Sequence, residues 1–256
     1  MFKKLTGILT TALLLSTVTF AQDDLKTFRN FQFSFDRVSG AYAKFNDSLG
    51  RMFRSKGLSY PPKDIFIRSF KAQNELELWG RDNSTDEYTL VKNYRICALS
   101  GILGPKRWEG DRQVPEGFYF IEEFNPRSDY YLSMLINYPN YSDKLLAQDK
   151  VRPGGDIYIH GGCQTIGCLP MTNNIIQELY IVCLNAKLAG QIYIPVHIYP
   201  TRFTRSALNF LGREYGQEDE KQRFWVNLKY QYDYFERNHR IMPVMYTPDG
   251  EYVYGN

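Results

Sequence analysis

The chain has 256 residues, of which 43% are hydrophobic, 16% aromatic and 23% charged, so its composition predicts a folded protein with a substantial core and excludes a disordered chain. Lys and Arg number 31 and Asp and Glu number 28. Removal of Lys3 and Lys4 with a leader would bring the net charge close to neutral, at about +1. Such a balance gives no electrostatic basis for nucleic-acid binding.

The first 21 residues predict a cleavable signal peptide. Lys3 and Lys4 precede an apolar run, and Thr19 and Ala21 occupy positions suited to signal peptidase, which predicts a mature start at Gln22. No cysteine stands at this junction, so a lipid anchor is not indicated. No later apolar run is long enough to span a membrane, and we therefore expect an exported, soluble protein.

Helical spacing of apolar residues over 35–57 predicts one long amphipathic helix that ends near Gly57. From residue 65 to residue 94 the pattern changes to alternation, which predicts antiparallel strands. Further strands are expected at 118–122 and 130–136. The segments 103–119 and 138–155 are rich in glycine, proline and charge, and we expect them to be loops. Long loops inside a compact domain are often functional.

The segment 156–172, DIYIHGGCQTIGCLPMT, combines reactive residues with flexible ones. It predicts a short buried strand, then His160, a glycine-rich turn, and Cys168 just before a helix. A helix N-terminus and a nearby histidine both lower a thiol pKa, which favours Cys168 as a nucleophile. Gly161 and Gly167 leave room for backbone N–H groups to face an oxyanion. We therefore predict a cysteine acyl-transfer site.

Three other interpretations of these cysteines stay open at this point. Zinc binding by His160, Cys163 and Cys168 needs a fourth ligand. The remaining candidates for that ligand are scattered along the chain: Cys97, Cys183, His197 and His239. A disulfide between Cys163 and Cys168 is compatible with export, although it would close a tight ring. Both cysteines are otherwise small buried residues, an interpretation that suits Cys163 better than Cys168.

The last third of the chain predicts a helix, a strand and further helices. Residues 172–174 are good N-caps for a helix that ends at Gly190. The alternating strand 192–199 carries His197, which we expect to be structural. From residue 201 onward the chain is predicted helical, with one apolar face: Phe224, Trp225, Leu228, Tyr232 and Phe235. Strands in the middle and helices at both ends predict an α+β fold.

Two stretches, GPKRWEGDRQVPEGFY at 104–119 and IHGGCQTIGCLPMT at 159–172, resemble the L,D-transpeptidase (YkuD-type) catalytic domain family, and are most similar to its murein YafK-like branch. The resemblance runs from about residue 60 to residue 199. It implies a mixed β-sandwich or barrel-like domain with flanking N- and C-terminal helices, a periplasmic location, and peptidoglycan stem peptides as substrate. We expect no cofactor and no metal.

The resemblance also implies roles for individual residues. Cys168 would be the nucleophile and His160 its base, and the Gly161 carbonyl would orient the imidazole. The N–H groups of Gly167 and Cys168 would hold the oxyanion during acyl transfer.

The sequence departs from the family pattern in two places. Ile166 stands where the family usually has histidine, and residues 169–170 replace a hydrophobic residue followed by arginine. The second change removes an expected anchor for the substrate. We therefore predict that Lys106 and Arg112, in the loop 103–119, bind stem-peptide carboxylates, with Thr165 as a further substrate-binding residue.

The predicted division of the chain is a signal peptide at 1–21, an N-terminal helical segment at 22–60, a catalytic domain at 61–200 and a C-terminal helical extension at 201–256. The first function hypothesis is cysteine-dependent acyl transfer on peptidoglycan, either as crosslinking or as hydrolysis. Hydrolysis here includes cleavage of a bond between peptidoglycan and a protein, which would make a peptidoglycan-linked protein a partner. The second hypothesis is a non-catalytic periplasmic module that binds the cell wall.

Overall fold

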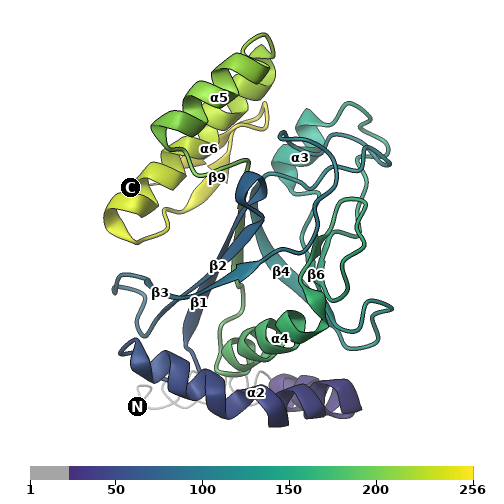
Figure 1. The fold of residues 1–256 in the computed structure, drawn as a ribbon, viewed down its shortest axis with the longest axis vertical. Coiled ribbons are helices and arrows are strands. Elements are labelled where there is room, and N and C mark those ends of the chain that lie inside the picture. The colour runs from purple at the N-terminus through teal and green to yellow at the C-terminus, as the bar shows by residue number, and fades with distance from the viewer. Residues whose placement is uncertain (1–22, 256) are drawn as a thin grey trace, which may run out of the picture.

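The computed structural model describes residues 23–255, and Figure 1 shows a curled central sheet with helices at its two ends. The predicted signal peptide, residues 1–21, lies outside the described residues. Within 23–255, no helix combines the length and the apolar character that crossing a membrane requires.

The N-terminal side of the molecule consists of a helix over 23–33 and then α2 (Asp36–Ser55). Asp36 in the first turn of α2 interacts favourably with the helix dipole. The buried face of α2 repeats at helical spacing: Val38, Ala41, Phe45, Leu49 and Phe53. This face packs against α4 (Thr172–Leu188) and the sheet, as Figure 1 shows at the lower end of the molecule. The helix predicted over 35–57 is thereby confirmed.

The central sheet has eight strands in the order β3-β2-β1-β8-β4-β5-β6-β7. Their bounds are β1 Asp64–Phe70, β2 Glu75–Arg81, β3 Thr89–Arg95, β4 Gly117–Asn125, β5 Ser133–Ile136, β6 Tyr158–His160, β7 Leu169–Pro170 and β8 Pro195–Tyr199. The β1–β8 and β6–β7 pairs are parallel and the other pairs are antiparallel. The predicted α+β, barrel-like architecture with flanking helices is confirmed.

A short helix and a two-stranded hairpin were not predicted. A short helix, α3 (Tyr141–Leu146), lies within the segment 138–155 that was expected to be a loop. Asn140 and Asp143 form a capping box at its N-terminus, and burial raises the pKa of Asp143 to about 7. After the C-terminal helices, β9 (Val244–Tyr246) and β10 (Tyr252–Tyr254) form a separate hairpin.

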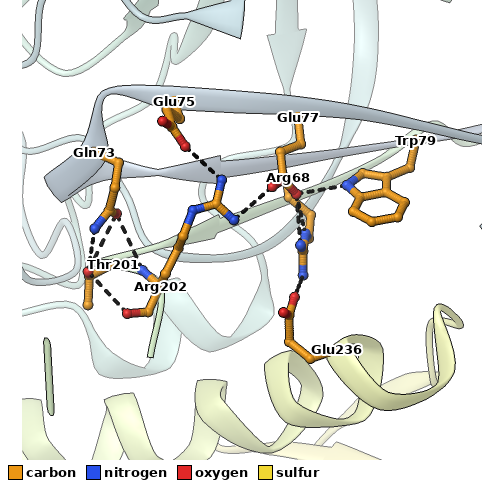
Figure 2. A network of polar contacts seen from close by, with 8 residues as sticks. All are labelled: Arg68, Gln73, Glu75, Glu77, Trp79, Thr201, Arg202 and Glu236. Carbon is orange, nitrogen blue, oxygen red and sulfur yellow. Dashed lines mark hydrogen bonds and ion pairs between the residues drawn. The ribbon is translucent and has the colours of Figure 1, made fainter. Parts of the chain in front are cut away.

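The C-terminal side consists of α5 (Arg205–Tyr215) and α6 (Asp219–Asn238), at the upper end of Figure 1. The predicted apolar face of α6 is buried. A charged network also joins this side to the sheet, through β1, β2, α6 and the segment after β8 (Figure 2). Its members are Arg68, Gln73, Glu75, Glu77, Trp79, Thr201, Arg202 and Glu236.

Arg68 is the centre of this network and is 2% exposed. Its guanidinium meets the Glu77 carboxylate at 2.7 Å and Glu236 of α6 at 2.7 Å. Burial is the largest single effect and would raise the pKa of Glu77, but Arg68, Trp79 and Arg202 together outweigh it, so the pKa is lowered. The carboxylate of Glu77 is therefore charged and fully paired inside the fold.

A second buried pair connects the C-terminal helices to the loop that follows β3. Lys71 and Glu116 are 3% and 0% exposed and their charged atoms lie 2.9 Å apart. Trp225 of α6 donates its indole N–H to Glu116 at 2.7 Å, and Gly104 donates its backbone N–H to the same carboxylate at 2.7 Å. Lys71 also donates to the carbonyls of Gly104 and Val114. Both ends of the loop 104–116 are therefore held by one ion pair.

Candidate active site

His160 ends β6, and Cys168 directly precedes β7, the parallel strand next to β6. The register pairs Ile159 with Leu169 and His160 with Pro170, so Cys168 lies beside Tyr158. Side chains alternate along a strand, which turns His160 and Cys168 toward the same side of the β6–β7 pair. Both line one cavity of about 380 Å³, together with Thr165.

The imidazole of His160 is buried and oriented by one contact. Its Nδ1 lies 2.5 Å from the Gly161 carbonyl oxygen. With Nδ1–H donating to that oxygen, Nε2 is left without a proton and can accept one. Burial lowers the pKa of His160, and the bond to Gly161 offsets this only in part. The side chain is therefore neutral at pH 7 and suited to act as a base.

The thiol of Cys168 differs from the prediction. Burial raises its pKa, the Tyr158 N–H lowers it, Asp156 raises it and Lys106 lowers it, with a net upward shift. The predicted lowering by a helix N-terminus is wrong, because β7 separates Cys168 from α4, which begins only at Thr172. Sγ accepts the Tyr158 N–H at 3.4 Å and contacts the Asp156 carbonyl at 3.5 Å. The resting site thus holds a thiol and a neutral imidazole in one cavity.

Two glycines of the turn between His160 and Cys168 are required by close approaches. A Cβ at Gly161 would lie 2.5 Å from the Tyr130 carbonyl, and Gly167 has φ +142 with the Gln113 carbonyl 3.0 Å from its Cβ position. The Gly167 N–H donates to the Thr165 hydroxyl at 3.2 Å. Its predicted role toward an oxyanion therefore stays a prediction.

Cys163 forms a disulfide with Cys97, 66 residues earlier in the chain. The alternative pairing of Cys163 with Cys168 is therefore wrong, and the interpretation of Cys163 as a small buried residue is wrong too, because Cys163 is exposed. Cys168 and Cys183 are free thiols. Within the described part of the chain, no group of three or more His, Cys, Asp or Glu residues is placed to hold a metal.

The disulfide fastens the site turn to the end of β3. Cys97 follows β3, and its backbone N–H also donates to the Pro170 carbonyl at 2.9 Å. The turn that separates His160 from Cys168 is therefore held to the other edge of the curled sheet by a covalent bond and a hydrogen bond.

Of the three predicted substrate-binding residues, one lines the cavity and two do not. Thr165 lines the cavity, and its hydroxyl donates to the Cys168 carbonyl at 2.9 Å. Lys106 is 4% exposed and forms an ion pair with Asp111 at 2.6 Å, while Arg112 is exposed. Neither of these two lines the cavity. Lys106 is a structural residue of its loop, since Asp111 also accepts three backbone N–H groups there.

Sequence reasoning did not find the cavity wall opposite the turn. Arg127 and Tyr130 lie between β4 and β5 and line the cavity, and the Tyr130 ring centroid is 4.5 Å from that of His160. No local motif marks these residues. His197, in contrast, is buried among Phe66 and Phe118 with its pKa lowered to about 3 by burial, which fits the predicted structural role.

Comparison with known proteins shows the family of the chain. The model of the YkuD L,D-transpeptidase catalytic domain matches residues 66–198. The chain belongs to the L,D-transpeptidase family. It is 36% identical over 191 residues to the protein named "Putative L,D-transpeptidase YafK" of Escherichia coli strain K12, covering 74% of this chain and 73% of that protein. The predicted family and branch are confirmed. L,D-transpeptidases act on peptidoglycan, which supports a peptidoglycan-related function for this chain.

Solved structures with a similar fold are more distant. The helical cell shape determining protein Pgp2 of Campylobacter jejuni is 19% identical with a TM-score of 0.43, over 72% of this chain and 73% of that one. A lysine-to-alanine variant of Pgp2 aligns with 55% of this chain and 49% of its own length, at 22% identity and a TM-score of 0.42. Bd1075 of Bdellovibrio bacteriovorus is 20% identical with a TM-score of 0.39, over 68% and 63%.

Proposed function

We propose that this L,D-transpeptidase family member is a periplasmic cysteine acyl-transfer enzyme of peptidoglycan, with Cys168 as nucleophile and His160 as base. One observation carries the proposal: a free thiol and a neutral imidazole, oriented through the Gly161 carbonyl, line the same cavity. A wall-binding module would have no need for this combination. Family membership supplies the substrate class, stem peptides of peptidoglycan.

The reaction begins with transfer of the Cys168 proton to His160 Nε2. The thiolate attacks the carbonyl at the L-centre of a diaminopimelate-type residue, and a tetrahedral oxyanion forms. The carbon–nitrogen bond then breaks, and the leaving amine takes the proton from the imidazolium. The acyl group remains on Sγ as a thioester. His160 next deprotonates an amine or water, which attacks the thioester and releases the thiol with its proton restored.

The raised pKa of Cys168 fits a reaction in which substrate triggers proton transfer. In the free protein the thiol is stable because burial disfavours the thiolate. A substrate carbonyl near Sγ provides an acceptor for the negative charge, and the buried imidazole provides a place for the proton. The thiolate is therefore formed mainly when it is about to be used.

Substitution of Cys168 tests the nucleophile. We expect Cys168→Ala to abolish conversion of isolated peptidoglycan, measured by mass spectrometry of digests, and to leave the thermal transition nearly unchanged. Cys183→Ala is the matched control, because Cys183 is the other free cysteine and lies buried in α4. Conversion by Cys168→Ala would overturn the assignment. Binding of stem peptides without conversion by wild-type protein would favour the wall-binding module instead.

The same digests, with and without an added acceptor amine, distinguish transfer from hydrolysis. The acyl-enzyme is common to both outcomes, and the product depends on whether amine or water reaches it first. The family's arginine after the cysteine is replaced by residues 169–170, so the acceptor side differs from the usual one. We expect hydrolytic products at least as abundant as new crosslinks, including release of protein linked to peptidoglycan. Digests dominated by new crosslinks would contradict this.

Export is the remaining part of the proposal. Cleavage of residues 1–21 should give a mature protein that begins at Gln22, which N-terminal sequencing of protein recovered from the periplasm would detect. The disulfide between Cys97 and Cys163 supports this location, because oxidising compartments favour such bonds.

A further inference from the structure

The cavity that holds Cys168 and His160 has a single cationic side chain among the described residues that line it, Arg127. Its anionic lining residues are Asp129 and Asp156. Within 23–255, Arg127 takes part in none of the ion pairs and makes no side-chain hydrogen bond. Its donors are therefore available to a ligand.

Aromatic rings hold the guanidinium of Arg127 in place without occupying those donors. Its Cζ lies 5.6 Å from the ring centroid of Phe31 and 5.2 Å from that of Phe35. Such contacts restrict a long side chain while leaving its N–H fork free for a planar anion. Phe31 belongs to the helix 23–33 and Phe35 precedes α2, so the N-terminal segment carries this support.

The turn that carries Arg127 is fixed as well. Arg37 of α2 donates to the Ser128 carbonyl at 2.8 Å and to the Tyr131 carbonyl at 2.5 Å. The backbone on both sides of Asp129 and Tyr130 is thereby attached to α2. The backbone that carries Arg127 is therefore held before any ligand arrives, and its exposed side chain lies against two rings, which reduces the entropy cost of binding.

We propose that Arg127 determines substrate specificity by binding a free carboxylate of the stem peptide. The inference rests on the proposed function and adds the residue that replaces the family's missing arginine. A guanidinium fork matches a carboxylate in a bidentate geometry. Asp156, in the segment before β6, disfavours a carboxylate on its own side of the cavity, and Arg127 is the one cationic side chain among the described lining residues that attracts one.

Two synthetic stem peptides test this assignment. They are identical except that the free carboxylate of the diamino acid is a carboxamide in the second. Their Kd values are measured in a Cys168→Ala background, in which no turnover occurs, and kcat/KM is measured with Cys168 present. We expect the protein to prefer the carboxylate peptide about tenfold to hundredfold.

Variants of Arg127 should change this preference in a graded manner. Arg127→Gln should remove most of it by weakening the carboxylate peptide alone, through KM, and Arg127→Lys should retain part of it. Arg29→Gln is the matched control, because Arg29 lies 4.8 Å over the Phe33 ring in the same N-terminal segment but does not line the cavity. The control should keep the full preference.

Three results would overturn the inference: no preference in the parent protein, a preference that survives Arg127→Gln, or an equal loss for both peptides. Failure of the proposed chemistry looks different. In that case neither peptide is turned over by wild-type protein, while the Kd preference and its dependence on Arg127 remain.

Discussion

The two helical sides of the molecule are attached to the sheet by different forces. On the N-terminal side, α2 packs through an apolar face against α4 and the sheet. On the C-terminal side, α6 has an apolar face and also contacts two buried charged residues of its neighbours. Its Glu236 pairs with Arg68 (Figure 2). Its Trp225 donates a hydrogen bond to Glu116. Apolar burial is non-directional, whereas buried ion pairs require one geometry. We infer that the C-terminal side holds its neighbours more specifically and responds to pH.

Each side also supports one wall of the cavity. The N-terminal side fixes the Arg127 wall through Arg37 and two phenylalanine rings. The C-terminal side fixes the loop 104–116, whose Gln113 carbonyl lies next to Gly167. Four substitutions test this division, from the largest expected effect to the smallest.

Glu116→Gln should lower the free energy of unfolding most, by about 3–5 kcal/mol, because it leaves a buried lysine without its carboxylate. Burial lowers the pKa of Lys71, so the unfolded chain binds more protons and stability rises with pH until the unfolded lysine also loses its proton near pH 10.4. Glu116 opposes this lowering, so the pKa of Lys71 is lower still in the variant, which gains more stability than wild-type protein as the pH rises. The loss of unfolding free energy relative to wild type, measured by urea unfolding, should therefore shrink between pH 7 and pH 10. A deficit that does not vary with pH would contradict the ionic attachment.

Leu49→Ala should lower the free energy of unfolding by about 3 kcal/mol, the effect of a cavity in a packed interface. Leu49 is 1% exposed and lies on the buried face of α2. Because no charge changes, the loss should be the same at pH 7 and pH 10. Urea unfolding at both pH values measures this loss of free energy. A loss that depends on pH would contradict the proposed difference between the two sides.

Trp225→Phe keeps the ring but removes the indole N–H that Glu116 accepts. We expect a loss of about 2 kcal/mol in unfolding free energy, since the bond goes to a charged group. It should also lower kcat/KM, because the loop 104–116 then loses its buried hydrogen bond to α6 and keeps the contacts of Arg107 with Glu220 and Phe224. Leu49→Ala, with a similar or larger stability loss, should leave kcat/KM nearly intact. Equal kinetic effects of the two variants would show that the loop is not specifically held.

Asp156→Asn should change the free energy of unfolding least, because Asp156 is exposed and belongs to neither helical side. Asn accepts the positive φ of +55 at this position. Burial is the main cause of the raised pKa of Cys168, and the Asp156 carboxylate adds to it, so its removal should lower that pKa slightly. Alkylation of the thiol as a function of pH measures this: wild-type protein should show a midpoint above that of an ordinary cysteine, and Asp156→Asn a lower one. A higher midpoint in the variant would be inconsistent with the electrostatics of the site.

The sequence predicted those parts of the molecule whose structure depends on residues close together in the chain. The helical period over 35–57 predicted α2, and the segment with His160, the glycines and Cys168 predicted an imidazole and a thiol at one site, which the cavity contains. Contacts between distant segments were not encoded in this way. The residues around Cys163 do not indicate that it pairs with Cys97. The sequence of the loop does not indicate that Lys106 forms an ion pair with Asp111. Arg127 was missed for the same reason, because its importance comes from the pairing of β5 with β6.

The molecule contains sulfur in two oxidation states that require opposite redox conditions. One is the disulfide between Cys97 and Cys163, and the other is the free thiol of Cys168. A reductant that protects the Cys168 thiol also reduces the disulfide of the exposed Cys163, and an oxidant that preserves the disulfide can oxidise Cys168. Thiolates are oxidised far more readily than thiols. The upward shift in the pKa of Cys168 therefore allows both sulfur states to coexist in one oxidising compartment. Buffers for assays should accordingly contain no dithiol reductant.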